Sequence, residues 1–282
     1  MRTGRRSVAP HPTPSGGPVT TDELQRDDVD EDLRRQDEHH RAVYPPLDTL
    51  KPVAPDVWIV DSGPLHAFGL ALPVRMTVIR LSDGGMWLHS PTRHVLGLRH
   101  DIERIGPIRH LVAPNVAHWS FVKGWSAACP LAAIWAAPGL RDRSPVKASG
   151  LRIDHDLGPA SPPAWAGEIE QRIVPAGFGV SEVAFFHAPS RTLVLTDLVE
   201  NLEPDKIGPI ARPLLRAAGA VAPDGMAPAH LRFVVNRRRS EARAVVAEIV
   251  GWNPVRVIFA HGRWFEHDGA ARLRRSLRWL LD

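Results

Sequence analysis

The stretch VRVIFAHG, residues 255–262, is a short apolar run that ends in a histidine and a glycine. A second run of the same kind, TLVLTD at residues 192–197, ends in an aspartate. Short apolar runs rich in β-branched residues predict buried strands. Each strand would then present a metal-binding side chain, His261 or Asp197, at its C-terminal tip. The two runs therefore predict a metal site built at the ends of two strands.

The composition limits the class of protein. A length of 282 residues predicts one large domain with a tail. Lysine and arginine number 35 against 31 acidic residues, a net charge of +4, and no basic stripe interleaved with aromatic residues occurs. Nucleic-acid binding is therefore disfavoured. Cys129 is the single cysteine, which excludes an internal disulfide and a cysteine-rich zinc site.

Targeting and membrane segments are not expected. Arg5-Arg6 is followed by a polar, proline-containing stretch at residues 11–14 instead of an apolar one, which argues against a secretory signal. No apolar run approaches the roughly 20 residues of a membrane span. We expect a cytoplasmic protein that does not enter a membrane.

Residues 1–45 differ from the rest of the chain. The first half of this segment is rich in Pro, Gly, Ser and Thr, and the second half is rich in acids and arginine with almost nothing apolar. Such a segment buries too little surface to offset the entropy lost on ordering. We therefore predict a disordered N-terminal tail over residues 1–45 and a folded domain over residues 46–282.

The folded part alternates between β-rich and helical stretches in each half. Turn residues and apolar periodicity predict strands at 57–60, 76–81, 86–89, 109–113, 133–136, 170–174, 183–186, 192–195 and 255–260. They predict helices at 95–105, 121–128, 207–218, 228–235, 240–250 and 270–281, with Ser240 as an N-cap. This order differs from the strict β–α alternation of a doubly wound sheet. It predicts an α+β fold, a four-layer αββα sandwich with two packed mixed sheets between helices.

Six segments, taken in their order and spacing, add a family resemblance. They are VAPDVWIVD (53–61), RMTVIRLSDG (75–84), WLHSP (87–91), HLVAPN (110–115), FFHAPSRTL (185–193) and AHG (260–262). The pattern resembles the metallo-β-lactamase-like hydrolase superfamily over about residues 47–282. More narrowly, it resembles an uncharacterised branch described only as a domain of unknown function. The resemblance implies the αββα sandwich.

In catalytic members of that superfamily, a His-x-His-x-Asp-His loop binds two metal ions. The matching loop here is PNVAHW at residues 114–119, which places Pro114 and Val116 where the first two histidines belong. In one register His118 takes the aspartate position and Trp119 the last histidine; a shift of one residue puts His118 on the last histidine instead. Both registers remain open, and in both the loop has lost most of its metal ligands.

The other ligand positions are mixed. Phe178 stands where the resemblance implies the middle histidine, whereas Asp197 matches the bridging aspartate and His261 the last histidine. His89 lies in the stretch that matches the Asp-x-Gly turn of the family and would point toward the same site. Imidazole and carboxylate groups are natural ligands of zinc and iron.

The surviving residues predict a remodelled site. His89, His118, Asp197 and His261 would hold one zinc or iron ion, and the alternative is that the site holds none. Trp119 and Trp264 flank the inferred site and would line a pocket. Residues Asn115, Glu200 and Asn201 would support the ligands or bind substrate.

Two hypotheses of function follow. One is a metal-dependent hydrolase with an atypical mononuclear site and an unknown small-molecule substrate. The alternative is a non-catalytic descendant of the fold that binds a small molecule or a partner in the same cleft. The sequence contains no Gly-x-Ser-x-Gly elbow, Walker phosphate loop or Gly-x-Gly-x-x-Gly motif, which argues against those enzyme classes. It does not determine whether the chain is an enzyme, nor its oligomeric state.

Overall fold

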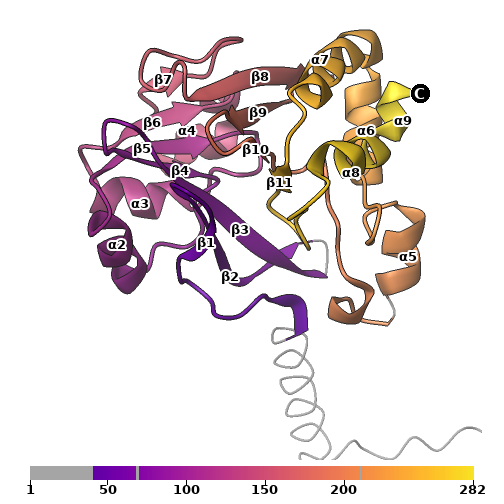
Figure 1. The fold of residues 1–282 in the computed structure, drawn as a ribbon, viewed down its shortest axis with the longest axis horizontal. Helices are drawn as coiled ribbons and strands as arrows, with labels where there is room; N and C mark the ends of the chain where they lie inside the picture. Colours follow the sequence, from indigo (N-terminus) through magenta and orange to yellow (C-terminus); the bar gives the residue numbers. More distant parts are fainter. Residues whose placement is uncertain (1–40, 68–69, 210) are drawn as a thin grey trace, which may run out of the picture. The chain divides into compact units, whose positions relative to one another are not determined.

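A computed structural model describes residues 41–67, 70–209 and 211–282 (Figure 1). Residues 1–40, and with them most of the predicted tail, lie outside the described residues. Residues 41–45 were also assigned to the tail, but Ala42 and Val43 are buried. None of the helices in the described ranges has the length and apolar composition needed to cross a membrane.

The strands form two sheets, one of seven strands and one of four. The first sheet has the order β1 (Lys51–Ala54), β2 (Val57–Ala67), β3 (Leu70–Arg80), β4 (Met86–His89), β5 (Ile108–Ala113), β6 (Ala133–Ala136) and β7 (His155–Asp156). Its pairs are antiparallel from β1 to β4 and parallel from β4 to β7. The second sheet has the order β11 (Arg256–Ile258), β10 (Thr192–Val194), β9 (Ser181–His187) and β8 (Ile169–Pro175), and only β10–β11 is parallel.

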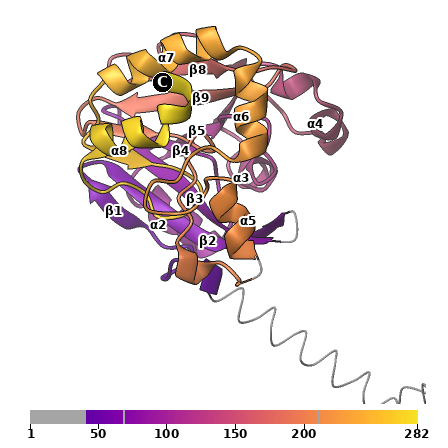
Figure 2. The same ribbon diagram turned by 90° about the vertical axis from the view of Figure 1, so that its right-hand side faces the viewer.

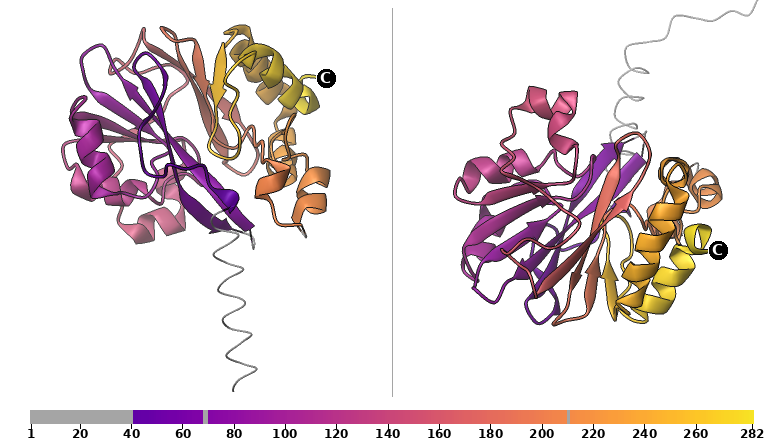
Figure 3. Two further views of the ribbon diagram at one scale, coloured as in Figure 1. Left: turned by 60° about the horizontal axis from the view of Figure 1, so that its bottom comes forward. Right: turned by 90° about the horizontal axis from the view of Figure 1, so that it is seen from above.

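Helices cover the outer face of each sheet (Figures 1 and 3). On the first sheet lie α2 (Leu96–Glu103), α3 (Val122–Ala128) and α4 (Ser144–Ser149), the last following the short η1 (Leu140–Asp142). On the second lie α6 (Ala229–Asn236), α7 (Arg239–Gly251), α8 (Gly269–Ser276) and α9 (Arg278–Leu281). The turn η2 (Pro204–Lys206) and α5 (Ala211–Ala217) lie between the second sheet and α6 in the chain, and Figure 2 shows α5 near one end of β2. The predicted α+β sandwich is confirmed.

Strand alternation divides the interior into three apolar layers. On β4, Met86 and Leu88 face the helices of the first sheet, whereas Trp87 faces the second sheet. On β9, Phe186 faces the helices of the second sheet and Phe185 faces the space between the sheets. Because both faces of these strands are buried, each contains a continuous apolar run, at 86–88 and 183–186, in place of an alternating pattern.

Several local predictions were wrong. Helix α7 begins at Arg239 with Arg238 at the N-cap, so Ser240 lies in the first turn and does not cap it. The predicted helix at 207–218 is the shorter α5, and the C-terminal helix divides at Leu277. The short elements β1, α4 and β7 were not predicted, because runs of two to six residues carry too little periodicity to be recognised.

The parallel pair β10–β11 places two site residues at one edge of the second sheet. Val194 lies opposite Ile258, and Leu195 N donates to Ile258 O at 2.9 Å. The chain after β10 reaches Asp197, and the chain after β11 reaches His261. Parallel strands bring their carboxyl ends to the same edge, so the predicted placement of these two side chains follows from the sheet itself.

Arg75, buried on β3, fixes the segment that carries His261. Its Nη1 donates to Phe259 O at 3.0 Å and to Gly262 O at 2.7 Å, and its Nη2 lies 2.7 Å from Asp61 Oδ1. Lys51 Nζ lies 2.7 Å from the other oxygen of Asp61. The charge of the buried guanidinium is thus balanced, and the first sheet is tied to the loop after β11.

Removing this guanidinium should destabilise the domain. Since an unpaired charge in a buried ion pair is costly, Arg75→Met should lower the free energy of unfolding by about 3 kcal/mol. The matched control is Arg80→Met on the same strand, whose pair with Asp56 is 45% and 39% exposed and should contribute less than about 1 kcal/mol. Urea denaturation of both variants measures the difference; equal losses would contradict the role assigned to Arg75.

Candidate metal centre

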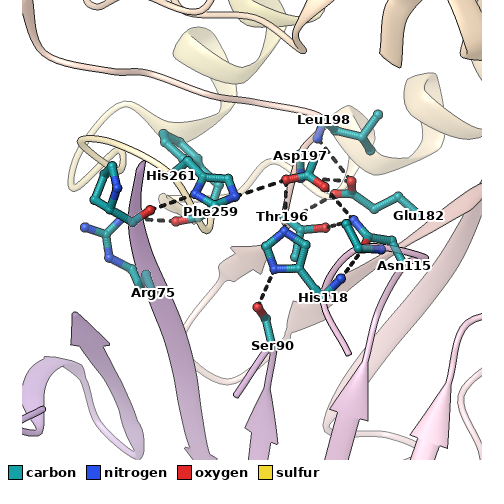
Figure 4. A network of polar contacts seen from close by, with 12 residues as sticks. Arg75, Ser90, Asn115, His118, Glu182, Thr196, Asp197, Leu198, Phe259 and His261 are labelled. Carbon is teal, nitrogen blue, oxygen red and sulfur yellow. Dashed lines mark hydrogen bonds and ion pairs between the residues drawn. The ribbon is translucent and has the colours of Figure 1, made fainter. Parts of the chain in front are cut away.

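Three side chains from separate elements converge at the edge between the sheets (Figure 4). His118 follows β5, Asp197 follows β10 and His261 follows β11. His118 Nε2 lies 3.0 Å from Asp197 Oδ1, and His261 Nε2 lies 3.4 Å from the same oxygen. One ligand atom from each residue lies within 4.8 Å of the other two. The group therefore presents two imidazole nitrogens and one carboxylate oxygen to a common point.

The loop after β5 is shaped by Asn115. Its side-chain Oδ1 accepts hydrogen bonds from Ala117 N at 2.8 Å and His118 N at 2.9 Å, which closes a tight turn. Its Nδ2 donates to Thr196 Oγ1 at 2.9 Å and to Asp197 Oδ2 at 2.7 Å. One amide thus turns the backbone so that His118 meets Asp197, and it also occupies the second oxygen of that carboxylate.

The other nitrogen of each imidazole is anchored. His261 Nδ1 lies 2.7 Å from Pro73 O, and because a carbonyl only accepts, Nδ1 carries the proton. His118 Nδ1 lies 2.7 Å from Ser90 Oγ, a hydroxyl that can donate or accept. Anchoring Nδ1 leaves Nε2 of each ring directed at Asp197, an arrangement typical of histidines that bind metals.

Gly262 allows the close approach of this segment to Asn201. Its φ of +88° lies in the left-handed region. A Cβ at this position would lie 2.3 Å from Asn201 O. The His-Gly pair in the sequence thus has a steric cause, because no larger residue fits after His261.

Glu182 on β9 holds the backbone that carries Asp197. Its Oε1 accepts from Thr196 N at 2.8 Å, and its Oε2 accepts from Asp197 N at 2.9 Å and Leu198 N at 3.1 Å. Glu182 is buried, and the three donors satisfy a carboxylate that would otherwise be costly to bury. The loop after β10 is therefore fixed from behind, while its Asp197 side chain faces the histidines.

Burial and charge set the protonation of the group. Burial raises the pKa of Asp197, but His118 and His261 outweigh it and hold that pKa well below its usual range. Burial lowers the pKa of His261, but the hydrogen bond and charge of Asp197, with a smaller effect of Glu200, raise it to about 9. Burial and the Asp197 charge raise the pKa of Glu182 to about 7, against the three backbone hydrogen bonds. Burial raises the pKa of Glu200 to about 7.

The donor set fits a transition-metal ion. Ligand atoms bound tetrahedrally to one zinc ion, with bonds of about 2.0–2.2 Å, lie about 3.3–3.6 Å apart. The separation of 3.4 Å between His261 Nε2 and Asp197 Oδ1 agrees with this range. The separation of 3.0 Å between His118 Nε2 and Asp197 Oδ1 would have to lengthen by a few tenths of an ångström. Two imidazoles and one carboxylate, with their outer atoms hydrogen-bonded, suit zinc or iron and leave a coordination position for a further ligand.

A cavity of about 620 Å³ opens onto these three residues. Its polar floor includes His118, Asp197 and His261, with Ser90 and Asn115 beside them. Most of the remaining wall is apolar, and it includes Leu72, Val116, Trp119, Phe121, Val180 and Leu231. The volume is in the range of small-molecule sites, and the few polar groups are gathered at one place.

The structure does not bring His89 into the group. His89 lies on β4 between the sheets, stacked on Trp87 with ring centroids 5.5 Å apart and edge-on to Phe185 at 5.4 Å. It is 1% exposed, and its Nε2 has no hydrogen-bond partner in the described part of the chain. Burial, and then the charge of His118, lower its pKa to about 3, so the ring is neutral. His89 therefore lies outside the group of His118, Asp197 and His261, in contrast to the expectation from the sequence.

The predicted pocket residues divide into two pairs. Asn115 and Trp119 line the cavity. Asn201 does not: its Nδ2 donates to Arg263 O at 2.7 Å and its Oδ1 accepts from Gly225 N, so it joins two backbone segments. Trp264 packs into the apolar layers around the second sheet. Both are structural, because a strand-end position places a side chain on either side of the backbone.

Three residues stand where the family resemblance implied histidine ligands, and they have other roles. Pro114 O accepts a hydrogen bond from Val183 N at 2.9 Å and so links the two sheets. Val116 lines the cavity. Phe178 is 72% exposed and contacts Arg237. Glu182 and Ser90 were not predicted; an acid directly before the apolar run at 183–186 was the one available signal for Glu182.

Comparisons with known proteins bear on the fold and the family of the chain. A family model described as a domain of unknown function, DUF4336, matches residues 55–221. Among curated proteins no match is found. Solved structures give similar folds at low identity. A metallo-β-lactamase from Pontibacter korlensis is 14% identical, with a TM-score of 0.56 over 83% of this chain and 99% of that chain.

Two further solved structures are similar. A metallo-β-lactamase from Pseudomonas aeruginosa, in a mono-zinc form, is 14% identical, with a TM-score of 0.55 over 82% of this chain and 94% of that chain. One from Hirschia baltica is 11% identical, with a TM-score of 0.54 over 82% and 97%. These similarities show the metallo-β-lactamase fold. Because the family model covers more than half of its length, the chain belongs to the family that shares this domain of unknown function, DUF4336.

Proposed function

We propose that the chain is a metal-dependent hydrolase with a single metal ion held by His118, Asp197 and His261, acting on a small molecule in the adjoining cavity. One observation carries the proposal: three ligand atoms from three separate elements lie within 4.8 Å of one another at the floor of a cavity of about 620 Å³. The mono-zinc form of the Pseudomonas aeruginosa relative is consistent with a single ion in this fold.

Zinc or iron is the proposed ion, and when bound it would supply a water molecule of lowered pKa as the nucleophile. The residues of the chain prepare the site for it. The Nε2 protons that now face Asp197 would be displaced by an ion, while Pro73 O holds the remaining His261 proton on Nδ1 and Ser90 Oγ can accept the one on His118 Nδ1. The largely apolar wall lowers the local polarity around these groups, which strengthens the electrostatic interactions inside the cavity.

A non-catalytic binding role is the alternative. The observation that favours it is the loop after β5, where Pro114 and Val116 serve the sheet contact and the cavity wall and cannot bind metal. In this alternative the His–Asp–His group is a hydrogen-bonded floor, and the cavity holds a ligand without changing it. The two functions use the same residues and differ in what happens to the bound molecule.

Metal content tests the site itself. Protein purified without a histidine tag from zinc- or iron-supplemented medium should carry about one equivalent of metal by elemental analysis. Asp197→Asn and His261→Ala should each retain less than about a tenth of that, because loss of one of three ligands removes most of the affinity. Glu182→Gln, which leaves all three ligands in place, should weaken metal binding about 10–100-fold by releasing the loop of Asp197.

The surface variant His267→Ala is the matched control for this measurement, because it removes an exposed histidine outside the cavity. Its metal content should equal that of the unchanged chain. Metal lost equally from His267→Ala and His261→Ala, or metal kept in Asp197→Asn, would contradict the assigned ligands.

Hydrolysis separates the two functions. Chromogenic esters and lactones with apolar substituents should be cleaved by the metal-loaded chain, lost on chelation and restored when metal is added back. The rate in Asp197→Asn should fall by at least about 100-fold, since the ion and its water leave together. Ligands that bind the metal-loaded chain and are recovered unchanged over a broad panel would support the binding role and overturn the hydrolase.

A further inference from the structure

Glu200 lies on the wall of the cavity, close to the metal-binding group. Its backbone is fixed by a hydrogen bond from its N to Met226 O at 3.2 Å. Gly225 packs against the same backbone so closely that a Cβ there would lie 2.0 Å from Glu200 O. The position of Glu200 in the wall is therefore set by tight packing behind it and not by a contact of its carboxylate.

In the described part of the chain three carboxylates line the cavity, and two of them already have hydrogen-bond or ion-pair partners. Glu182 accepts three backbone hydrogen bonds, and Asp197 is bound by Asn115 and both histidines. The carboxylate of Glu200 makes no hydrogen bond or ion pair within the described ranges; its neighbouring charges are His261 and Asp197. Glu200 is thus the cavity carboxylate left available to a ligand.

The rest of the wall offers little to an anionic ligand. Among the described residues that line the cavity there is neither lysine nor arginine. The basic side chains among these lining residues are the imidazoles of His118, His230 and His261, and His118 and His261 are engaged with Asp197. A partly buried carboxylate without a partner is costly, and a protonated amine beside it would relieve that cost through a charge-assisted hydrogen bond.

We propose that the cavity binds a small molecule that joins an apolar body to a protonated amine, with the amine paired to Glu200. The inference rests on the proposed function for the identity of the cavity, and it names the substrate class of that same site. The apolar body lies along Trp119, Phe121 and Leu231, and the ammonium group lies at the polar end. Glu200 here is a specificity-determining residue and not a metal ligand.

A matched series of probes tests this: 4-phenylbutylamine, 4-phenylbutanol and 4-phenylbutyrate, which share one apolar body. Binding is measured by isothermal titration calorimetry at pH 8, where Glu200, with a pKa of about 7, is ionised. The metal-free chain is measured first, because an amine also binds metals, and the zinc-loaded chain second. The amine should bind at least about tenfold more tightly than the alcohol or the acid.

Glu200→Gln keeps the shape and removes the charge, so it should weaken amine binding about tenfold and leave alcohol binding within about twofold. Glu266→Gln removes the same charge from an exposed position outside the cavity and should change neither. Equal binding of amine and acid, an unchanged preference in Glu200→Gln, or no amine binding at millimolar concentration overturns the inference. A chain that takes up no metal but keeps the amine preference refutes the proposed function alone.

Discussion

The carboxylate of Asp197 is the interaction on which the rest of the site depends. Its Oδ1 faces both imidazoles and its Oδ2 accepts from Asn115, so one group joins the loop after β5 to the ends of β10 and β11. The two sheets pack largely through apolar side chains, and this carboxylate adds a polar connection at one edge (Figure 4). A side chain at that point must be ionised and short, which aspartate satisfies.

The remaining polar groups make this buried charge possible. Glu182 accepts hydrogen bonds from the backbone N–H groups around Asp197, and Arg75 donates hydrogen bonds to the carbonyls around His261. Each residue thus provides partners for backbone polar atoms that would be costly to leave unpaired in an apolar interior. Glu182 and Arg75 lie on opposite sides of the site, Glu182 behind the loop after β10 and Arg75 behind the loop after β11 (Figure 4). The loops that carry Asp197 and His261 are therefore held in place by buried hydrogen bonds from behind.

The sandwich layers, and the proximity of Asp197 to His261, follow from the sequence for physical reasons. Apolar runs buried on both faces identified the strands, and the parallel pair carried Asp197 and His261 to one edge. The register of residues 114–119 was undetermined because it depends on the turn that Asn115 closes, and His89 was misplaced because β4 directs it between the sheets. The periodicity of a sequence does not predict the direction of side chains at strand ends. It also does not predict contacts between distant segments, such as those of Glu182.

Anomalous diffraction at the zinc edge from crystals of the zinc-loaded chain tests the central claim most directly. We expect one peak, within about 2.0–2.2 Å of His118 Nε2, a carboxylate oxygen of Asp197 and His261 Nε2, with His89 outside its coordination shell. A peak bound elsewhere, a peak that includes His89, or no peak between the three residues at full zinc loading would contradict it.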